Sequence, residues 1–313
     1  MGTSVAAFYR FVAFAPTELA PLRERLLDLG GQHDLRGTVL LAEEGINGAI
    51  CGGEAGVEAL LAELHTDPRL TALEVKRSEA PAQAFHRFKV RCKREIVTLG
   101  CPEANPAHGV GAYVAPAEWD ALIADPDTLM VDTRNAYEVA VGTFEGAIDP
   151  GTESFRDFPA WAERELRPLV AKRHPKALAL FCTGGIRCEK ATAWLLRHGF
   201  EGVHHLQGGI LRYLEEVPEA RSRWRGECFV FDRRVAVNHR LQPGSYRLCH
   251  ACGLPLSPAD RELESYVEGV SCLHCLDRFS DADRERFAER QRQIERAEAR
   301  GEHHIGPQGQ ESP

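Results

Sequence analysis

Over the first hundred residues, hydrophobic and polar positions follow strand and helix patterns in turn. Strand patterns cover residues 5–12, 37–41, 48–51 and 73–77. Helical spacing of apolar residues covers residues 17–29 and 57–64, and Gly30-Gly31 is expected to end the first helix. The order strand, helix, strand, strand, helix, strand is typical of a ferredoxin-like βαββαβ domain, which we place at residues 1–100. We interpret Asn47-Gly48 as part of the tight connection between the two middle strands.

A second alternating region follows a Pro- and Gly-containing linker at residues 101–111. Short strands are expected at residues 129–132, 177–181 and 203–206, and helices at residues 118–124, 158–170 and 188–198. Short strands alternating with helices predict a mostly parallel sheet covered on both faces. The chain is therefore expected to be of the α/β class, with this second domain at residues 113–220.

The remainder of the chain is polar and rich in cysteine. Cys249, Cys252, Cys272 and Cys275 form two C-x2-C pairs separated by nineteen residues. That spacing is typical of a structural four-thiolate zinc site, and iron in the same geometry remains the alternative. We therefore predict a metal-binding region at residues 221–280. A charged, solvated helix and a disordered tail are expected at residues 281–313.

A reactive thiol is predicted at Cys182, where a strand of small apolar residues ends. The loop Cys182-Thr183-Gly184-Gly185-Ile186-Arg187 is followed at once by a helix, whose N-terminal N–H groups stabilise an anion. Gly184 and Gly185 are expected to supply the positive backbone angles that curl this loop, and Arg187 a fixed charge at its rim. Only four residues separate Cys182 from Arg187, one fewer than in cysteine phosphatases, so a sulfur-sized group fits better than a phosphate. Cys188 is either a resolving thiol or a packing residue.

Charge changes this picture only locally. The formal net charge of the 313 residues is −8, which argues against a uniformly basic nucleic-acid binder. Between Lys76 and Arg94, however, basic residues surround Phe85, His86 and Phe88, and the second such patch lies at residues 221–234. We expect RNA contacts, with the aromatics available for stacking, from Lys89, Arg91, Lys93 and Arg94. An apolar stretch of membrane-spanning length and a signal sequence are both lacking, so we expect a cytoplasmic protein.

The sequence resembles the rhodanese-related tRNA uridine hydroxylases over nearly its whole length. The matching segments are residues 37–48, the rhodanese signature beginning Val131-Asp132-Thr133-Arg134, the Cys182 loop, and Leu206-Gln207-Gly208-Gly209-Ile210. The resemblance implies oxygen-dependent hydroxylation of the wobble uridine of tRNA at C5, with the anticodon region as partner. It also places Asp132 and Arg134 with Cys182, Arg187 and Cys188 in the catalytic set. Thr143 departs from common rhodaneses, which often have histidine there.

Two other functions remain open from the sequence. One is a sulfurtransferase that carries sulfane sulfur as a persulfide on Cys182, and the other is an RNA-binding module with an idle rhodanese domain. The sequence contains no flavin, haem or nucleotide motif, so molecular oxygen and structural zinc are the only expected cofactors. No protein partner is identifiable.

Overall fold

The computed structural model describes residues 3–80 and 83–300, which form two compact units. The first unit ends at Gly244 and contains two domains, and the second begins at Ser245. The expected disordered tail, residues 302–313, lies outside the described residues. In the part of the chain that is described, no helix is both long enough and apolar enough to cross a membrane.

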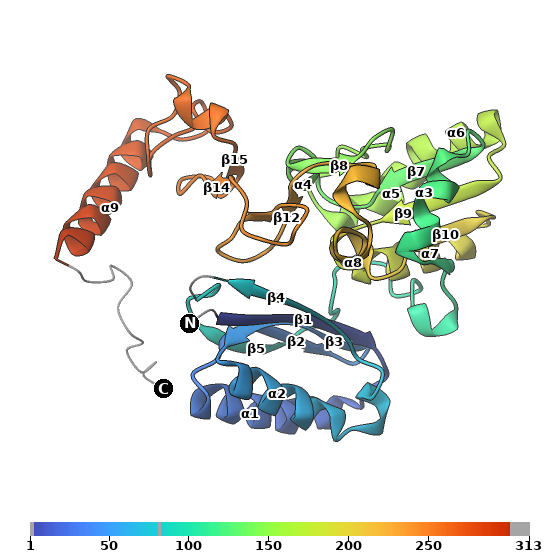
Figure 1. Cartoon of the computed structure of the whole chain (residues 1–313), viewed down its shortest axis with the longest axis horizontal. Helices are drawn as coiled ribbons and strands as arrows, with labels where there is room; N and C mark the ends of the chain where they lie inside the picture. The colour runs from blue at the N-terminus through green and yellow to red at the C-terminus, as the bar shows by residue number, and fades with distance from the viewer. Residues whose placement is uncertain (1–2, 81–82, 301–313) are drawn as a thin grey trace. The chain divides into compact units, whose positions relative to one another are not determined.

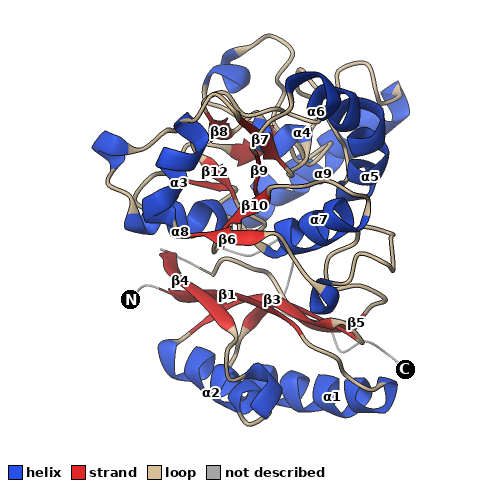
Figure 2. Cartoon of the chain, turned by 90° about the vertical axis from the view of Figure 1, so that its right-hand side faces the viewer, coloured by secondary structure: helices blue, strands red, loops and turns tan. Residues whose placement is uncertain are grey.

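The N-terminal domain is a five-stranded sheet with two helices on one face (Figures 1 and 2). Its elements are β1 (Thr3–Phe11), α1 (Pro16–Gln32), β2 (Arg36–Ala42), β3 (Gly45–Gly52), α2 (Glu54–His65), a 3-10 turn (Pro68–Leu70), β4 (Glu74–Ala80) and β5 (Phe88–Cys92). The strand order is β4-β1-β3-β2-β5, in which only the β2–β5 pair is parallel. Alternate residues such as Phe8, Val39 and Ile46 pack against the helices in one apolar core. The predicted βαββαβ order is confirmed, and β5 is an additional edge strand that we did not expect.

Two local predictions for this domain are wrong. Helix α1 does not end before Gly30-Gly31. A Cβ atom on Gly30 would lie 2.2 Å from the ring of Phe88, so this glycine allows the helix to pack closely on β5. The connection between β2 and β3 is formed by Glu43 and Glu44, and Asn47 lies inside β3.

The central domain has a four-stranded parallel sheet of order β6-β10-β9-β7. Its elements are a 3-10 turn (Pro106–His108), β6 (Ala112–Val114), α3 (Pro116–Ala124), β7 (Thr128–Asp132), α4 (Ala136–Val139), β8 (Gly142–Phe144), a 3-10 turn (Phe155–Asp157), α5 (Phe158–Trp161), a π-helical turn (Ala162–Leu166), α6 (Arg167–Arg173), β9 (Ala177–Phe181), α7 (Ile186–Arg197), β10 (Val203–Leu206) and α8 (Gly209–Glu216). Leu178 and Leu180 face one apolar core, whereas Ala179 and Phe181 face another. The sheet is therefore covered on both faces, as predicted.

Residues 219–244 complete the first unit. They contain a 3-10 turn (Glu219–Arg221), β11 (Trp224–Gly226), β12 (Cys228–Phe229) and β13 (Ala236–Val237). Strand β11 pairs antiparallel with β8, and Trp224 packs in the same core as Phe144. This segment thus packs with the central domain.

The second unit is organised around its four cysteines. It contains β14 (Arg247–Leu248), β15 (Pro255–Leu256), a 3-10 turn (Ala259–Glu262) and α9 (Asp281–Ala299). Cys249, Cys272 and Cys275 are buried beside Leu256, which makes the cysteine cluster the core of this unit. The predicted charged helix is present as α9.

Candidate active site

Cys182 lies directly after the fully buried strand β9, at the carboxyl edge of the parallel sheet. Its side chain is buried, and the N–H of Gly185 donates a hydrogen bond to Sγ at 3.1 Å. Helix α7 begins at Ile186, so its N-terminus follows the loop immediately. The loop therefore surrounds the sulfur with backbone donors, as the sequence predicts for a thiolate.

Two glycines keep this loop closed against the rest of the domain. Gly185 has φ of 99°, a conformation that favours glycine, whereas Gly184 has no positive φ, contrary to our expectation. Gly209 also has a positive φ, and a Cβ atom there would lie 2.5 Å from the carbonyl oxygen of Cys182. The next residue, Ile210, donates its N–H to that same oxygen at 2.9 Å. The Gly208-Gly209-Ile210 segment thus packs against the backbone of the loop and fixes its position.

The environment of Cys182 favours its thiolate. Burial by itself would raise the pKa of Cys182. The Cys188 thiol, the charge of Arg187, and backbone N–H groups of Cys188 and Gly185 more than offset burial and lower the pKa to about 6. The pKa of Cys188 is raised, chiefly by burial and by its proximity to Cys182. Of this pair, Cys182 is therefore the thiol whose ionised form is favoured, and Cys188 is the thiol that keeps its proton.

Arg187 is buried rather than placed at the loop rim. Its guanidinium makes a bidentate ion pair with Glu138, at 2.7 and 2.6 Å, and the Glu138 side chain is fully buried. Burial opposes ionisation of Glu138, but the Arg187 charge outweighs it and lowers the pKa of Glu138. Both terminal nitrogens of the Arg187 guanidinium are bonded to the Glu138 carboxylate, so Arg187 is held in one position. From there its positive charge stabilises the Cys182 thiolate.

Asp132 and Arg134 form a second buried ion pair in the central domain. The guanidinium of Arg134 contacts both carboxylate oxygens of Asp132, at 2.9 and 2.6 Å, and both side chains are fully buried. Thr143 donates a hydrogen bond to Asp132 at 2.9 Å, so the residue that departs from common rhodaneses supports this pair. Neither Asp132 nor Arg134 lines the cavity described next.

A cavity of about 610 Å³ opens between the N-terminal sheet and the Cys182 loop. Helices α1 and α2 cover one face of the N-terminal sheet (Figure 2). Residues of the other face line one wall of the cavity, and the loop lines the opposite wall. Among the predicted site residues, the cavity is lined by Cys182, Thr183, Gly184, Ile186 and Arg187. Residues 230–241 contribute a third side, which includes the exposed ring of Phe231. A cavity of this size accommodates a nucleotide-sized ligand.

Contacts between the two domains fix this geometry. Lys76 Nζ donates to the carbonyl oxygen of Gly184 at 2.8 Å, and the Tyr9 hydroxyl donates to Glu189 at 2.8 Å. Lys190 is buried and pairs with Glu44 at 2.8 Å and with Glu95 at 2.6 Å. The sequence pattern places Lys76 in a basic surface patch, but its side chain is only 14% exposed.

Sequence reasoning missed Tyr9, Glu189 and Lys190 as parts of the site. The contacting residues lie up to 180 positions apart in the chain, so no local pattern joins them. The one sequence feature that could have pointed to Glu189 and Lys190 is their position at the start of the helix directly after the Cys182 loop, in the run Glu189-Lys190-Ala191.

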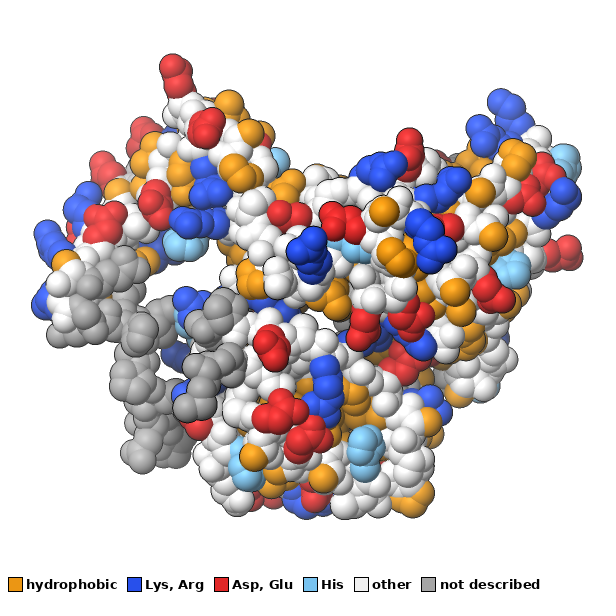
Figure 3. Space-filling model, in the orientation of Figure 1, with side chains coloured by type: hydrophobic (Ala, Val, Ile, Leu, Met, Phe, Trp, Pro, Cys, Tyr) orange, Lys and Arg blue, Asp and Glu red, His pale blue; other side chains and the backbone are white. Residues whose placement is uncertain are grey.

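The expected RNA-contacting cations lie on and after the edge strand β5. Lys89 and Arg91 are exposed and stand in register with Thr38 and Leu40, which line the cavity. Neighbouring residues in register share a sheet face, so Lys89 and Arg91 extend the cavity wall outward. Lys93 and Arg94 are exposed just beyond the strand. Acidic and basic side chains are otherwise mixed over the face shown in Figure 3.

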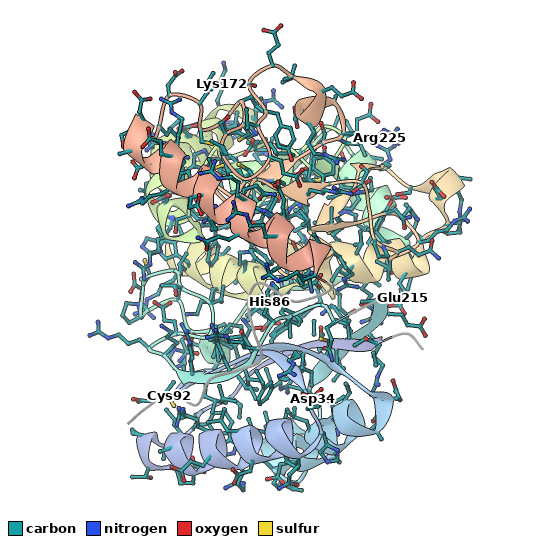
Figure 4. All side chains as sticks on the ribbon, turned by 90° about the vertical axis from the view of Figure 1, so that its left-hand side faces the viewer. Asp34, His86, Cys92, Lys172, Glu215 and Arg225 are labelled. Carbon is teal, nitrogen blue, oxygen red and sulfur yellow. The ribbon has the colours of Figure 1, made fainter. Side chains whose placement is uncertain are left out.

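The aromatic part of that prediction needs correction. Phe88 packs against the N-terminal core, and Phe85 is half-buried against a small cluster that contains Val5. Phe85 nevertheless lines the cavity, so of these two rings only Phe88 is placed where it cannot stack on a base. His86 is exposed (Figure 4). In the second basic patch, Arg234 is buried in an ion pair with Asp232.

The cysteine cluster of the second unit has the geometry of a four-thiolate metal site. Its four Sγ atoms lie within 4.8 Å of one another. Neighbouring sulfurs are separated by 4.0 Å (Cys249–Cys275), 3.7 Å (Cys252–Cys272) and 3.6 Å (Cys272–Cys275). A tetrahedral zinc ion with bonds of about 2.3 Å requires sulfur separations of about 3.8 Å, so these residues fit such an ion.

Comparison with known proteins agrees with both domains. Residues 3–96 match the model of the UPF0176 acylphosphatase like domain, and residues 115–216 match that of the rhodanese-like domain. A solved rhodanese-like domain from Anabaena sp. overlaps 36% of this chain and 78% of its own, at 16% identity and a TM-score of 0.28. The two family models by themselves describe a rhodanese-like domain that follows an acylphosphatase-like N-terminal domain.

Curated relatives narrow the class further. A tRNA uridine(34) hydroxylase of Prochlorococcus marinus (strain MIT 9313) is 60% identical over 93% of this chain and 94% of its own length. Another, from Synechococcus sp. (strain CC9605), is 59% identical over 93% of this chain and 90% of its own. The protein belongs to the tRNA uridine(34) hydroxylase family.

Proposed function

We propose that this protein, a hydroxylating oxidoreductase of tRNA, converts uridine 34 in the anticodon to 5-hydroxyuridine in the cytoplasm, with oxygen as co-substrate. The observation that carries this proposal is the low-pKa thiolate of Cys182 in the wall of a nucleotide-sized cavity. Enzymes that act on a nucleobase take the base out of its stack into such a pocket. The names of the close relatives supply the base and its position.

The thiolate can activate C5 by covalent addition. In this hypothesis Cys182 Sγ bonds to C6 of the uracil, and the electron pair of the C5=C6 double bond passes to C5 and O4. C5 then bonds to oxygen, after which loss of the C5 proton and expulsion of the thiolate restore the double bond. One atom of O2 enters the product. The other leaves as water, with two electrons and two protons from an external reductant.

The function is tested by nucleoside mass spectrometry of total tRNA from cells with and without this protein. We expect 5-hydroxyuridine and nucleosides derived from it to disappear when the protein is absent. If the nucleosides are unchanged, the hydroxylase proposal fails. The sulfurtransferase would then be favoured, because a backbone donor at 3.1 Å from Sγ also suits a persulfide. That function would show as a persulfide on Cys182 after incubation with a sulfur donor.

Lys89 and Arg91 are proposed to bind tRNA phosphates beside the cavity. Replacing both with alanine is expected to weaken tRNA binding and to reduce the slope of log Kd against log salt by about 1.4–1.8, because two phosphate contacts are lost. The measurement is a binding titration over about 50–200 mM salt. The same double replacement at Lys172 and Arg173, exposed on α6 away from the N-terminal sheet (Figures 1 and 4), is the control. Equal slopes for the two double variants would contradict the proposal.

We propose that Cys249, Cys252, Cys272 and Cys275 hold a structural zinc ion. Replacing Cys272, which is fully buried, with serine is expected to reduce zinc from about one ion per chain to near zero and to expose residues 245–300 to protease, because the ion and the cysteines form the core of this unit. Metal analysis and limited proteolysis measure both effects. Cys92→Ser, at an exposed cysteine (Figure 4), should change neither. Iron in the wild-type protein would overturn the choice of metal.

A further inference from the structure

The uncovered face of the N-terminal sheet carries one amide side chain into the cavity. Asn47 lies in β3, in register with Tyr9 of β1 and Leu40 of β2, and all three line the cavity. Its neighbours Ile46 and Ile50 pack on the helix side, as the alternation of a strand requires. Asn47 therefore faces the Cys182 loop across the cavity.

A single hydrogen bond fixes which way this amide points. Asn47 Nδ2 donates to the carbonyl oxygen of Ile96 at 2.9 Å. Exchanging the amide nitrogen and oxygen would set two acceptors against each other, so the orientation is locked. One N–H and the carbonyl Oδ1 remain for a ligand, because within residues 3–80 and 83–300 no other hydrogen bond to this side chain is present. The side chain thus offers one donor next to one acceptor.

The opposite wall also has an unused polar group. Thr183 is only 8% exposed and lines the cavity beside Cys182. Its hydroxyl is buried and has no hydrogen-bond partner in the described part of the chain. Buried polar groups are nearly always paired, so a ligand or a water molecule completes this one. Ala7, Leu40 and Ile186 add apolar surface to the same cavity, which suits a flat heterocycle.

We propose that Asn47 is the residue that recognises the target base as uracil. Oδ1 accepts the N3–H of uracil, and the free N–H of Nδ2 donates to the adjacent ring carbonyl. C5 and C6 lie on the ring edge opposite N3, so this contact turns the reacting edge toward Cys182. The Thr183 hydroxyl meets a polar group of the same nucleotide. Cytosine has no proton on N3 and presents an amino group beside it, so the locked amide rejects it. This inference rests on the proposed hydroxylase function.

The test compares tRNA carrying uridine or 3-methyluridine at position 34, because methylation replaces the N3–H donor with a methyl group on the edge that Asn47 would contact. Formation of the 5-hydroxy nucleoside by the full-length wild-type protein is expected to show kcat/KM about 10–100-fold lower for 3-methyluridine. In Asn47→Ala, kcat/KM for uridine should fall by a similar factor, and the ratio between the two substrates should shrink to near one. A merely structural asparagine would slow both substrates equally and leave the ratio unchanged.

Asn105→Ala is the matched control, since Asn105 is a half-buried asparagine that caps a turn outside the cavity and should retain the wild-type ratio. An unchanged ratio in Asn47→Ala overturns the inference. If that variant does not fold, equal kcat/KM for the two substrates with wild-type protein overturns it instead. Wild-type protein that hydroxylates neither substrate would refute the proposed function itself, which is a distinct outcome.

Discussion

Replacing Cys182 with serine is expected to abolish 5-hydroxyuridine formation, with a loss of at least about 100-fold. The hydroxyl of serine stays protonated at neutral pH, whereas the surroundings of Cys182 lower the pKa of its thiol to about 6. The replacement is nearly isosteric, so the fold should persist. Single-turnover assays on tRNA, with the 5-hydroxy nucleoside measured by mass spectrometry, give the effect directly.

Cys228→Ser makes the same change at another fully buried cysteine of the first unit, one that does not line the cavity, and should retain activity. Full activity of Cys182→Ser would show that the thiol takes no part in hydroxylation.

The pH profile of the hydroxylation rate supplies a second check, because the reactive form of Cys182 is the thiolate. The wild-type rate should fall as the pH decreases through about 6.

Replacing Glu138 with alanine is expected to lower the free energy of unfolding by about 3–5 kcal/mol. The substitution leaves the Arg187 guanidinium buried without its bidentate partner, and Arg187 is also one of the groups that stabilise the Cys182 thiolate. Denaturant unfolding of the full chain measures the loss. The pKa of Cys182 should change at the same time, because Arg187 is no longer held in place.

Glu163→Ala is the matched control, since it breaks an exposed pair with Arg167 and should change stability by no more than about 0.5 kcal/mol. Equal losses of stability in the two variants would contradict the role assigned to burial.

The pH dependence of stability follows from the lowered pKa of Glu138. Stability from a depressed carboxyl pKa is present above the unfolded value, about 4.3, and is lost as pH falls through the folded value. The difference in the free energy of unfolding between the wild-type protein and Glu138→Ala should therefore become smaller at acidic pH.

Local sequence patterns were sufficient to predict the elements that carry the chemistry. Strand β9 and the loop after it are defined by adjacent residues, because an apolar run, two glycines and an arginine all lie within eleven positions, Ala177–Arg187. The two C-x2-C pairs likewise predicted the cysteine cluster, since the two cysteines of each pair lie within a single turn and could bind one ion together. The parallel sheet followed from strands alternating with helices.

The sequence failed where a residue's role depends on a distant partner. Arg187 was expected at the loop rim, but Glu138, 49 positions away, holds it in the interior. Gly30 was interpreted as a helix stop, but the ring of Phe88 on β5 makes it a packing glycine. Asn47 was interpreted as a turn residue, although its strand position makes it face the cavity.

The sequence by itself thus determined most of the order of secondary structure, the position of Cys182 at a strand end and the cluster of four cysteines, since each is set by contacts between near neighbours in the chain. Only the tertiary structure decided that the N-terminal sheet supplies the second wall of the cavity. Lys76 reaches Gly184 across 108 positions, and Tyr9 reaches Glu189 across 180. Which residues form such pairs depends on how the surfaces of two domains pack against each other. The spacing of residues along one strand or helix does not determine this packing.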